Sequence, residues 1–176
     1  MWPRPPLFRC QRDQAGVFDP ARAADPEHTG QLERGADRGF ARCPLRCQGR
    51  QRSLDVMRWG LVPFWAKDIK VGFANINAKA EGIDTKPAFR EAFVRRRCLI
   101  PFDCFYEWKK LGKEREPYAV GLADRRLMAL AGLWETWRSP AGERVRSFAI
   151  ATTAANSLLA PVHDRMPVML APENWP

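Results

Sequence analysis

The 176-residue chain has few of the residues from which metal sites and disulfide frameworks are built. It contains five cysteines and two histidines, and Cys43-x3-Cys47 lacks the second ligand pair that a zinc site needs. An odd number of cysteines, in a chain that begins without an apolar secretory segment, indicates a reduced, cytoplasmic protein. No apolar run reaches the length of about 18 residues that suggests a membrane-spanning helix. We therefore expect no metal, no organic cofactor and no membrane association.

The net charge of +9 favours a polyanionic partner, with nucleic acid as the first candidate. Its distribution weakens that inference, because residues 54–176 hold 19 Lys and Arg against 14 Asp and Glu. An excess of this size is also typical of an ordinary solvated surface. Charge alone is weak support for nucleic-acid binding.

Residues 1–53 differ in composition from the rest of the chain. They contain ten arginines and no lysine, and neither the helical nor the strand period of apolar residues appears in them. One interpretation is a disordered basic arm, and the other is translation in a wrong reading frame. At Leu54 the composition changes abruptly, and residues 54–176 are expected to form one folded domain.

Apolar patterning from Leu54 onward predicts a domain of mainly β structure with a few short helices. Asp84 and Pro87 suit the start of a helix over 86–95, and a second short helix is expected near 155–159. Arg95, Arg96 and Arg97 at the first helix's end suit either its dipole or a phosphate. The fold class is α+β with a mixed, barrel-like sheet. Strands are expected at 54–62, 98–100, 102–108, 117–122, 127–135, 145–153 and 168–170.

Two residues are candidates for proton transfer. Glu107 stands between Tyr106 and Trp108, where burial would raise the pKa of its carboxyl toward a useful range. The alternative is an ordinary acid on the wet face of a half-buried strand. His163 is the one histidine after residue 53, in a polar loop where reactive residues are often found.

Other residues suggest contact with a nucleic acid. Trp59, Trp65 and the neighbouring Lys67 suit stacking on splayed bases beside a phosphate, although most tryptophans are core residues. Asn77 offers an amide in a segment with few polar side chains, but a lone Asn more often caps a turn.

Five of these residues, Trp59, Trp65, Asn77, Glu107 and His163, belong to six strings that occur in order over residues 54–173. The strings are Arg58-Trp59-Gly60-Leu61-Val62-Pro63-x-Trp65, Asn77-Ala78-Lys79-Ala80-Glu81, Cys98-Leu99-Ile100-Pro101 with Phe105-Tyr106-Glu107-Trp108, Gly132-Leu133-Trp134-Glu135, Thr152-Thr153-Ala154-Ala155-Asn156 and His163-Asp164-Arg165-Met166-Pro167. Through them the chain closely resembles the SOS response-associated peptidase (SRAP) family, whose members process abasic sites in single-stranded DNA. The resemblance implies a β-rich fold with a positively charged groove.

The resemblance also implies a mechanism. In the family, a cysteine exposed by removal of the initiator methionine attacks the aldehyde of the ring-opened abasic sugar. Its α-amine, with a pKa of about 8, is partly unprotonated at neutral pH and forms a Schiff base. Its thiol then closes a thiazolidine, which leaves a stable protein–DNA crosslink.

The family's site residues carry over to positions in this chain. Asn77 would orient the sugar, Glu107 would shuttle protons, and His163 would exchange a proton with the sugar oxygen and the intermediates. The residues that would hold single-stranded DNA are Trp59, Trp65, Lys67, Lys79 and Arg165.

The chain departs from the family at both ends. Position 2 is Trp2, and Cys10 is too far from the terminus to supply a vicinal amine and thiol. Codons for Glu33 to Arg38, read one nucleotide later, can spell the family segment Asn-Ala-Ala-Pro-Thr. This supports the hypothesis that residues 2 to about 50 are out of frame, and the coding DNA upstream of Leu54 tests it. Because the chain also stops early, at 173–176, we expect a domain incomplete at both ends that folds poorly and forms no stable crosslink.

Two alternatives to this enzyme remain. A non-catalytic single-stranded nucleic-acid binder would keep the groove without the chemistry. A cysteine peptidase would use Cys104 with His163, although a cysteine on an aromatic strand is more often a buried structural thiol. In each case we expect a monomer.

Overall fold

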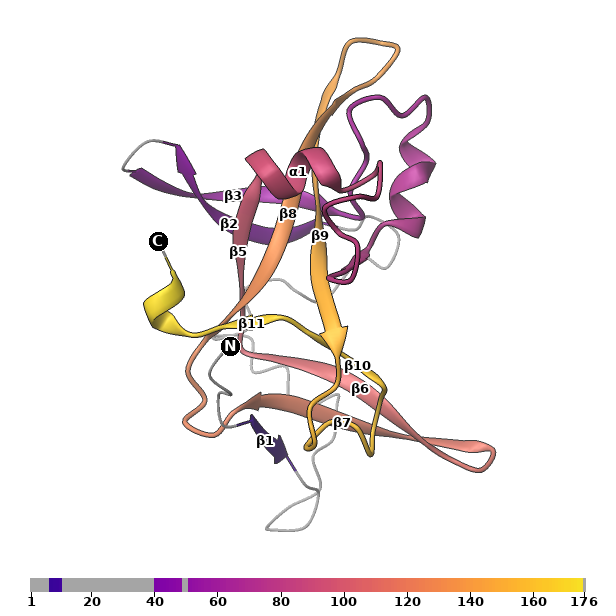
Figure 1. The fold of residues 1–176 in the computed structure, drawn as a ribbon, viewed down its shortest axis with the longest axis vertical. Helices are drawn as coiled ribbons and strands as arrows, with labels where there is room; N and C mark the ends of the chain where they lie inside the picture. The colour runs from indigo at the N-terminus through magenta and orange to yellow at the C-terminus, as the bar shows by residue number, and fades with distance from the viewer. Residues whose placement is uncertain (1–6, 11–39, 49–50, 176) are drawn as a thin grey trace.

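The computed structural model describes residues 7–10, 40–48 and 51–175, which form two β-sheets and three short helical segments (Figure 1). The smaller sheet has the strand order β1-β7-β6. Its strands are β1 (Leu7–Cys10), β7 (Glu114–Leu122) and β6 (Cys104–Leu111). The larger sheet has eight strands in the order β10-β9-β3-β2-β5-β8-β11, with β4 paired to β9. These strands are β2 (Phe40–Gln48), β3 (Gln51–Trp59), β4 (Asn77–Lys79), β5 (Arg97–Phe102), β8 (Met128–Arg138), β9 (Arg144–Ala154), β10 (Arg165–Pro167) and β11 (Met169–Leu170).

Strand β9 is the member to which most of the larger sheet is joined. It runs parallel to β3 and β4 and antiparallel to β8 and β10, so the sheet is mixed, as predicted. The pairings β9-β3-β2-β5-β8 lead back to β9, but β3 meets β9 through two residue pairs and β2 meets β5 through one. Over the described residues the sheet is therefore strongly curved without being a closed barrel.

Apolar side chains on both faces of β8 and β9 explain why these strands lie at the centre. One core contains Leu130, Phe148 and Ile150, and the other contains Leu133 and Ala149. Side chains alternate between the two faces of a strand, so a nearly continuous apolar sequence fills both cores at once. In the expected strand 127–135 each residue from Met128 to Trp134 is buried except the half-buried Ala131, whereas Leu127 is exposed.

The expected strands are confirmed with small changes of boundary, whereas the helix predicted at 86–95 is wrong in extent and the one predicted near 155–159 is absent. Helix α1 is Arg90–Arg95, not 86–95, and its N-cap is Phe89 instead of Asp84. The chain before it forms turns, in which the Lys86 amide donates to the carbonyl of Gly82 (3.1 Å), a residue with φ of 76°. Around 155–159 the chain likewise forms turns, whose first amides donate to the Asn156 carboxamide. The other helical segments are 3₁₀ turns, η1 (Ile69–Ala74) and η2 (Pro172–Asn174).

Strands β6 and β7 form a long hairpin that projects from the rest of the molecule (Figure 1). Leu111 pairs with Glu114, so the loop has two residues, and Gly112 occupies its first position with φ of 63°. A positive φ at the first loop residue is the geometry of a type II′ turn, which matches the twist of paired strands. Glycine adopts it without strain.

The structure reaches part of the segment 1–53, for which disorder or a wrong reading frame is the sequence-based expectation. It describes β1 and β2 there, together with the first residues of β3. Positions 1–6, 11–39 and 49–50 lie outside the described residues, and with them Trp2 and the out-of-frame hypothesis for Glu33 to Arg38. The expectation for 1–53 as a whole stays a prediction.

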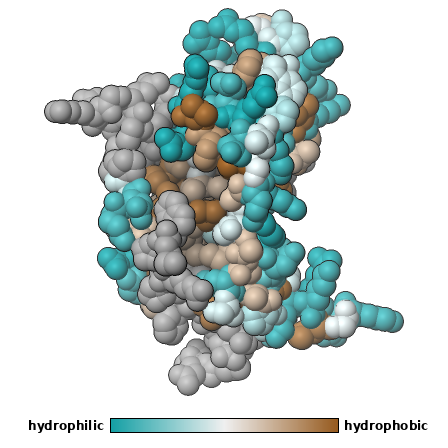
Figure 2. Space-filling model, in the orientation of Figure 1, coloured by the Kyte–Doolittle hydropathy of each residue, from teal (hydrophilic) through white to brown (hydrophobic). Residues whose placement is uncertain are grey.

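Figure 2 shows that the face drawn in Figure 1 is hollowed between the body above and the hairpin below. Apolar residues line the floor of the hollow, and hydrophilic residues surround much of it. Within the part of the chain that the structure describes, no helix is long and apolar enough to cross a membrane.

Candidate functional site

The register between β4 and β9 places two of the predicted site residues on one exposed face. Asn77 lies opposite Ile150, and Lys79 lies opposite Thr152. Between them Ala78 is fully buried, while Asn77 and Lys79 are both exposed. Because alternate residues of a strand share a face, the amide and the ammonium project in the same direction from the sheet.

Arg165 reaches the same place from the other side of β9. It begins β10 opposite Ala154, and its guanidinium donates to both carboxylate oxygens of Glu81 at 3.0 and 2.9 Å. Its Nη2 also donates to the Thr152 carbonyl oxygen at 2.7 Å. The same carbonyl accepts from the amide of Ala80, just after β4 (2.8 Å). The guanidinium therefore spans β9 and ties β10 to the end of β4.

His163 is held beside Arg165 by a tight turn. The Arg165 amide donates to His163 Nδ1 at 3.0 Å, and an Asp164 carboxylate oxygen lies 3.2 Å from the same nitrogen. The Arg165 carbonyl oxygen also lies 3.2 Å from Nδ1, so this nitrogen can accept from the Arg165 amide in one tautomer and donate to the carbonyl or the carboxylate in the other. The imidazole side chain is 44% exposed, so the ring is accessible to a ligand. We call the residues gathered here the β9 patch: Asn77, Lys79, Glu81, Thr152, His163 and Arg165.

Trp59 adjoins this patch. Its ring stacks on Phe148 of β9, with centroids 6.4 Å apart and planes 7° from parallel, and its Nε1 donates to the carbonyl of Ile76, the residue before Asn77. The ring is 39% exposed. Trp59 is thus partly packed and partly exposed, and its stacking on bases stays a prediction.

Trp65 and Lys67 lie on the loop between β3 and β4. They flank the buried Ala66, whose carbonyl accepts from Trp137 Nε1 at 2.6 Å. Both flanking side chains are exposed, so Trp65 is not a core residue. No hydrogen bond or ion pair connects either one to the β9 patch among the described residues.

Glu107 lies in the smaller sheet, apart from Asn77 and His163 by topology. It pairs with Tyr118 of β7, and no hydrogen bond or ion pair joins it to Asn77 or His163 within the described residues. Tyr106 and Trp108 are each about half exposed, on the opposite face of β6 from the partly buried Glu107. The expectation of a carboxylate between these two rings is therefore corrected: the ring that shares a face with Glu107 is that of the buried Tyr118, across the ladder.

The Glu81 carboxylate and the Thr152 carbonyl are members of the patch that the sequence analysis did not select. The Arg165 hydrogen bond, aided by the Glu81 backbone amide and by the charges of Arg165 and Lys79, lowers the pKa of Glu81 to about 2. The contact joins residues 84 positions apart, so no local pattern could have revealed it. Glu81 at the end of the string Asn77-Ala78-Lys79-Ala80-Glu81 was the available signal.

A second ion pair, away from the patch, accounts for the central residue of the arginine triplet. Arg96 Nη1 donates to Glu135 Oε2 at 3.2 Å, and the Glu135 side chain is only 3% exposed. Burial raises the pKa of Glu135, against the opposing influence of the Thr136 amide and the Arg96 charge. Arg96 is thus the partner of a buried carboxylate, a role that the sequence did not indicate.

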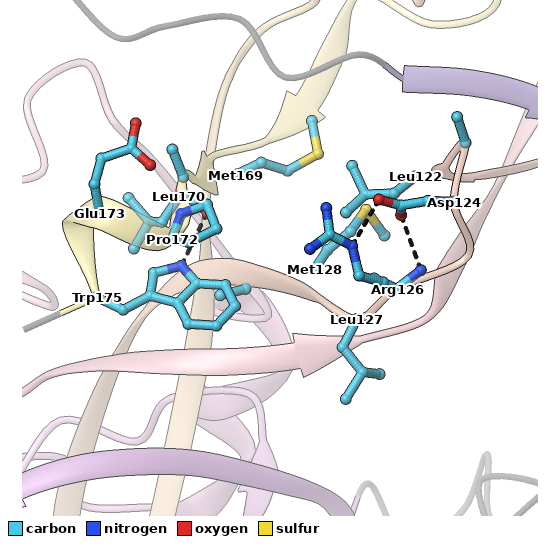
Figure 3. Close-up of a pocket in the computed structure, with 13 residues that line it drawn as sticks. Leu122, Asp124, Arg126, Leu127, Met128, Met169, Leu170, Pro172, Glu173 and Trp175 are labelled. Atoms are coloured by element: carbon cyan, nitrogen blue, oxygen red, sulfur yellow. Dashed lines mark hydrogen bonds and ion pairs between the residues drawn. The ribbon is translucent and has the colours of Figure 1, made fainter.

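The structure also has an apolar cavity of about 550 Å³ beside β8 and β11 (Figure 3). Met128, Met169 and Trp175 are among its lining residues. Its charged pair is internally satisfied, since Arg126 Nε donates to Asp124 at 2.6 Å. None of the predicted site residues lines it. Nor does the described part of the chain contain a group of three or more His, Cys, Asp or Glu that could hold a metal ion.

The fold and the patch define a class: a β-rich protein with a mixed sheet that gathers an amide, an imidazole and two cations on one exposed face. The family model described as SOS response associated peptidase (SRAP) matches residues 15–176. The chain belongs to this family.

Curated relatives carry names of one kind. The abasic site processing protein YoqW of Bacillus subtilis is 47% identical over 127 residues, which cover 72% of this chain and 57% of that protein. The abasic site processing protein HMCES of Xenopus tropicalis is 29% identical over 142 residues, which cover 68% of this chain and 42% of the Xenopus protein. The chain therefore spans little more than half the length of the bacterial relative.

Solved structures share the fold. A protein from Bacteroides thetaiotaomicron superposes with a TM-score of 0.70 at 32% identity, covering 76% of this chain and 60% of that one. A protein from Bordetella bronchiseptica gives 0.67 at 28% identity, with coverage of 75% and 68%. These likenesses agree with a β-rich fold that has few short helices.

Proposed function

We propose that this protein binds single-stranded DNA at the β9 patch and processes abasic sites in it. The observation that carries the proposal is the strand register that brings Asn77, Lys79, His163 and Arg165 together around β9. These are four of the eight residues that the family resemblance implies. The names of the relatives, abasic site processing proteins, support the same substrate.

The patch offers complementary groups to an abasic sugar and its phosphates. Lys79 is an exposed ammonium for a phosphate. Trp59, and Trp65 on the neighbouring loop, offer exposed ring surface on which flanking bases can stack. The Asn77 amide can donate to a sugar hydroxyl or accept from it, and the exposed His163 imidazole can exchange a proton with the sugar oxygen as the sugar opens.

The covalent chemistry would proceed at the aldehyde of the opened sugar. A cysteine α-amine adds to the aldehyde carbon, and loss of water gives the Schiff base. The thiol of the same cysteine then adds to the C=N bond, and its proton passes to nitrogen, which closes a thiazolidine. We assign the transfer of these protons to Glu107, which lies on β6 of the β6–β7 hairpin. Position 2 of this chain is Trp2, so the family's attacking cysteine has no counterpart there.

One binding experiment separates this proposal from a non-catalytic binder. Two oligonucleotides of the same length, one intact and one with a central abasic site, are titrated with the protein. Tighter binding to the abasic strand is expected, and Asn77→Ala or His163→Gln should reduce that preference more than they reduce binding to the intact strand. Equal affinity for the two strands would favour a simple single-stranded nucleic-acid binder.

A denaturing gel of the same mixtures tests the covalent step. We expect no stable crosslink from this chain, because Trp2 stands where the family has its attacking cysteine. A shifted band that survives denaturation would refute that expectation and identify the chain as a crosslinking enzyme.

The cysteine peptidase remains a second hypothesis from a different class. Cys104 begins β6 of the smaller sheet, where it pairs with Gly121, whereas His163 lies beside β10 of the larger one. Alkylation of Cys104 that leaves activity intact would exclude it. We propose that the protein acts in the DNA-damage response as a monomer in the cytoplasm.

A further inference from the structure

Three of the five N–H groups of Arg165 are directed to partners within the protein. A guanidinium has five N–H groups in a fixed fork. One hydrogen of Nη1 is directed to Glu81 Oε1, and the two of Nη2 are directed to Glu81 Oε2 and the Thr152 carbonyl. The Nε atom is buried and has no partner within the described residues. A single N–H, the second one of Nη1, is left for a ligand.

The Glu81 carboxylate takes the position that a bidentate phosphate would take. Arginine recognises carboxylates and phosphates through the same pair of parallel N–H groups. Arg165 already binds Glu81 in this way through Nη1 and Nη2. A phosphate could acquire the fork only by displacing the carboxylate, whose side chain is 58% exposed while that of Arg165 is 23% exposed.

We propose that Glu81 is a specificity-determining residue that keeps the Arg165 fork from the phosphates of intact single strands. This inference rests on the proposed function, because it assigns the β9 patch to single-stranded DNA. Glu81 acts through Arg165 and is thus a positioning residue. With the fork occupied, Lys79 and the single remaining N–H of Arg165 are the cationic groups of the patch that can meet the backbone, and affinity for undamaged DNA is held down.

The electrostatics of the pair agree with a permanent contact. The pKa of Glu81 is lowered to about 2 by Arg165 and, more weakly, by Lys79. The carboxylate therefore stays ionised at neutral and mildly acidic pH, and the fork is not released by protonation there. Only substitution, or a competing anion, frees it.

The test compares two exposed acids on β9 or next to it. Glu81→Gln removes the charge that holds the fork, and Glu143→Gln makes the same charge change in the turn before β9, at the opposite end from Thr152. Binding to an intact fluorescent oligothymidylate is measured by anisotropy at several salt concentrations. For Glu81→Gln we expect binding about twofold to fivefold tighter at low salt. The slope of log K against log salt should become steeper by about 0.7, the value for one more phosphate on a single strand.

Two further variants guard against a trivial explanation. Glu81→Asp keeps the charge on a shorter side chain, and its binding should fall between wild type and Glu81→Gln. Adding Arg165→Gln to Glu81→Gln removes the cation that the first substitution frees and should abolish the change of slope, whereas a general loss of structure would not follow this order.

Every outcome decides the matter. A slope for Glu81→Gln equal to that for Glu143→Gln overturns the inference, and so does undetectable binding by both wild type and Glu81→Gln. Binding that appears only in Glu81→Gln supports it. The proposed function fails on a different result, an equal affinity of the wild type for abasic and intact strands.

Discussion

Replacing Arg96 with alanine should be among the most destabilising surface-accessible changes in this protein. The substitution leaves the Glu135 carboxylate, 3% exposed, without its 3.2 Å partner, and the Thr136 amide is the one hydrogen-bond donor that remains to it among the described residues. Removing one member of a buried pair costs about 3–5 kcal/mol. The Arg96 side chain is 31% exposed, so water can partly replace it, and we expect a loss of about 3 kcal/mol. In a protein of this size that lowers the Tm by roughly 6–12 °C.

The pH dependence of that loss identifies its cause. Burial raises the pKa of Glu135 above its usual 4.5, so the folded state binds this proton more tightly than the unfolded state does. Stability from this group therefore falls as the pH rises from 4.5 through the folded pKa. Removal of Arg96 raises the folded pKa further. The difference between variant and wild type should then be full at alkaline pH and shrink as the pH falls toward 4.5.

The measurement is urea unfolding of wild type, Arg96→Ala and Arg95→Ala at about pH 8 and again near pH 5. Arg95 is the matched control, because it is the adjacent arginine, 73% exposed, and its only ion pair is a 3.8 Å contact with Glu91 among the described residues. Its loss should be below about 0.5 kcal/mol. If the two variants unfold alike, or if the Arg96→Ala deficit stays the same in acid, the reasoning about a buried, uncompensated carboxylate is refuted.

Three other changes test different parts of the molecule. Lys79→Ala should weaken binding to single-stranded DNA and make the salt slope shallower by about 0.7, whereas Lys113→Ala, in the hairpin loop, should leave the slope unchanged in the same anisotropy titration. Gly132→Ala would put a methyl group 2.5 Å from Ile100 Cδ1 and should destabilise the protein by about 1–3 kcal/mol; an unaltered urea midpoint would contradict this. The stability that the ionised Glu81 adds is present above pH 4.5 and lost as the pH falls toward about 2, so Glu81→Gln should flatten that part of the curve of unfolding free energy against pH.

The strands were accessible from the sequence because their signal is local. The apolar run that became β8 and the alternation in β6 each follow from the two-residue period of a strand. The helix expected at 86–95 failed for a related reason: Asp84 and Pro87 are good starting residues, but Gly82 closes a turn with the Lys86 amide and delays the helix to Arg90.

The site was only partly accessible. Asn77, Lys79, His163 and Arg165 were selected through the family strings, and the register of β9 is what unites them. The Arg96–Glu135 and Arg165–Glu81 contacts join residues 39 and 84 positions apart. Such partners are fixed by which strands pair, and nothing in the neighbouring residues of either partner specifies that. Whether Glu107 works with the β9 patch stays a prediction for the same reason.

Because β9 pairs with both β4 and β10, its register fixes where the residues of the β9 patch lie. Deleting one residue between Phe148 and Thr152 would move every following side chain of β9 to the opposite face of the sheet, because side chains alternate between the two faces. The β9 residues beside Asn77, Lys79 and Arg165 would then all be displaced together. Point changes in the patch should be tolerated one by one, while a single-residue slip in this strand should remove every contact at once.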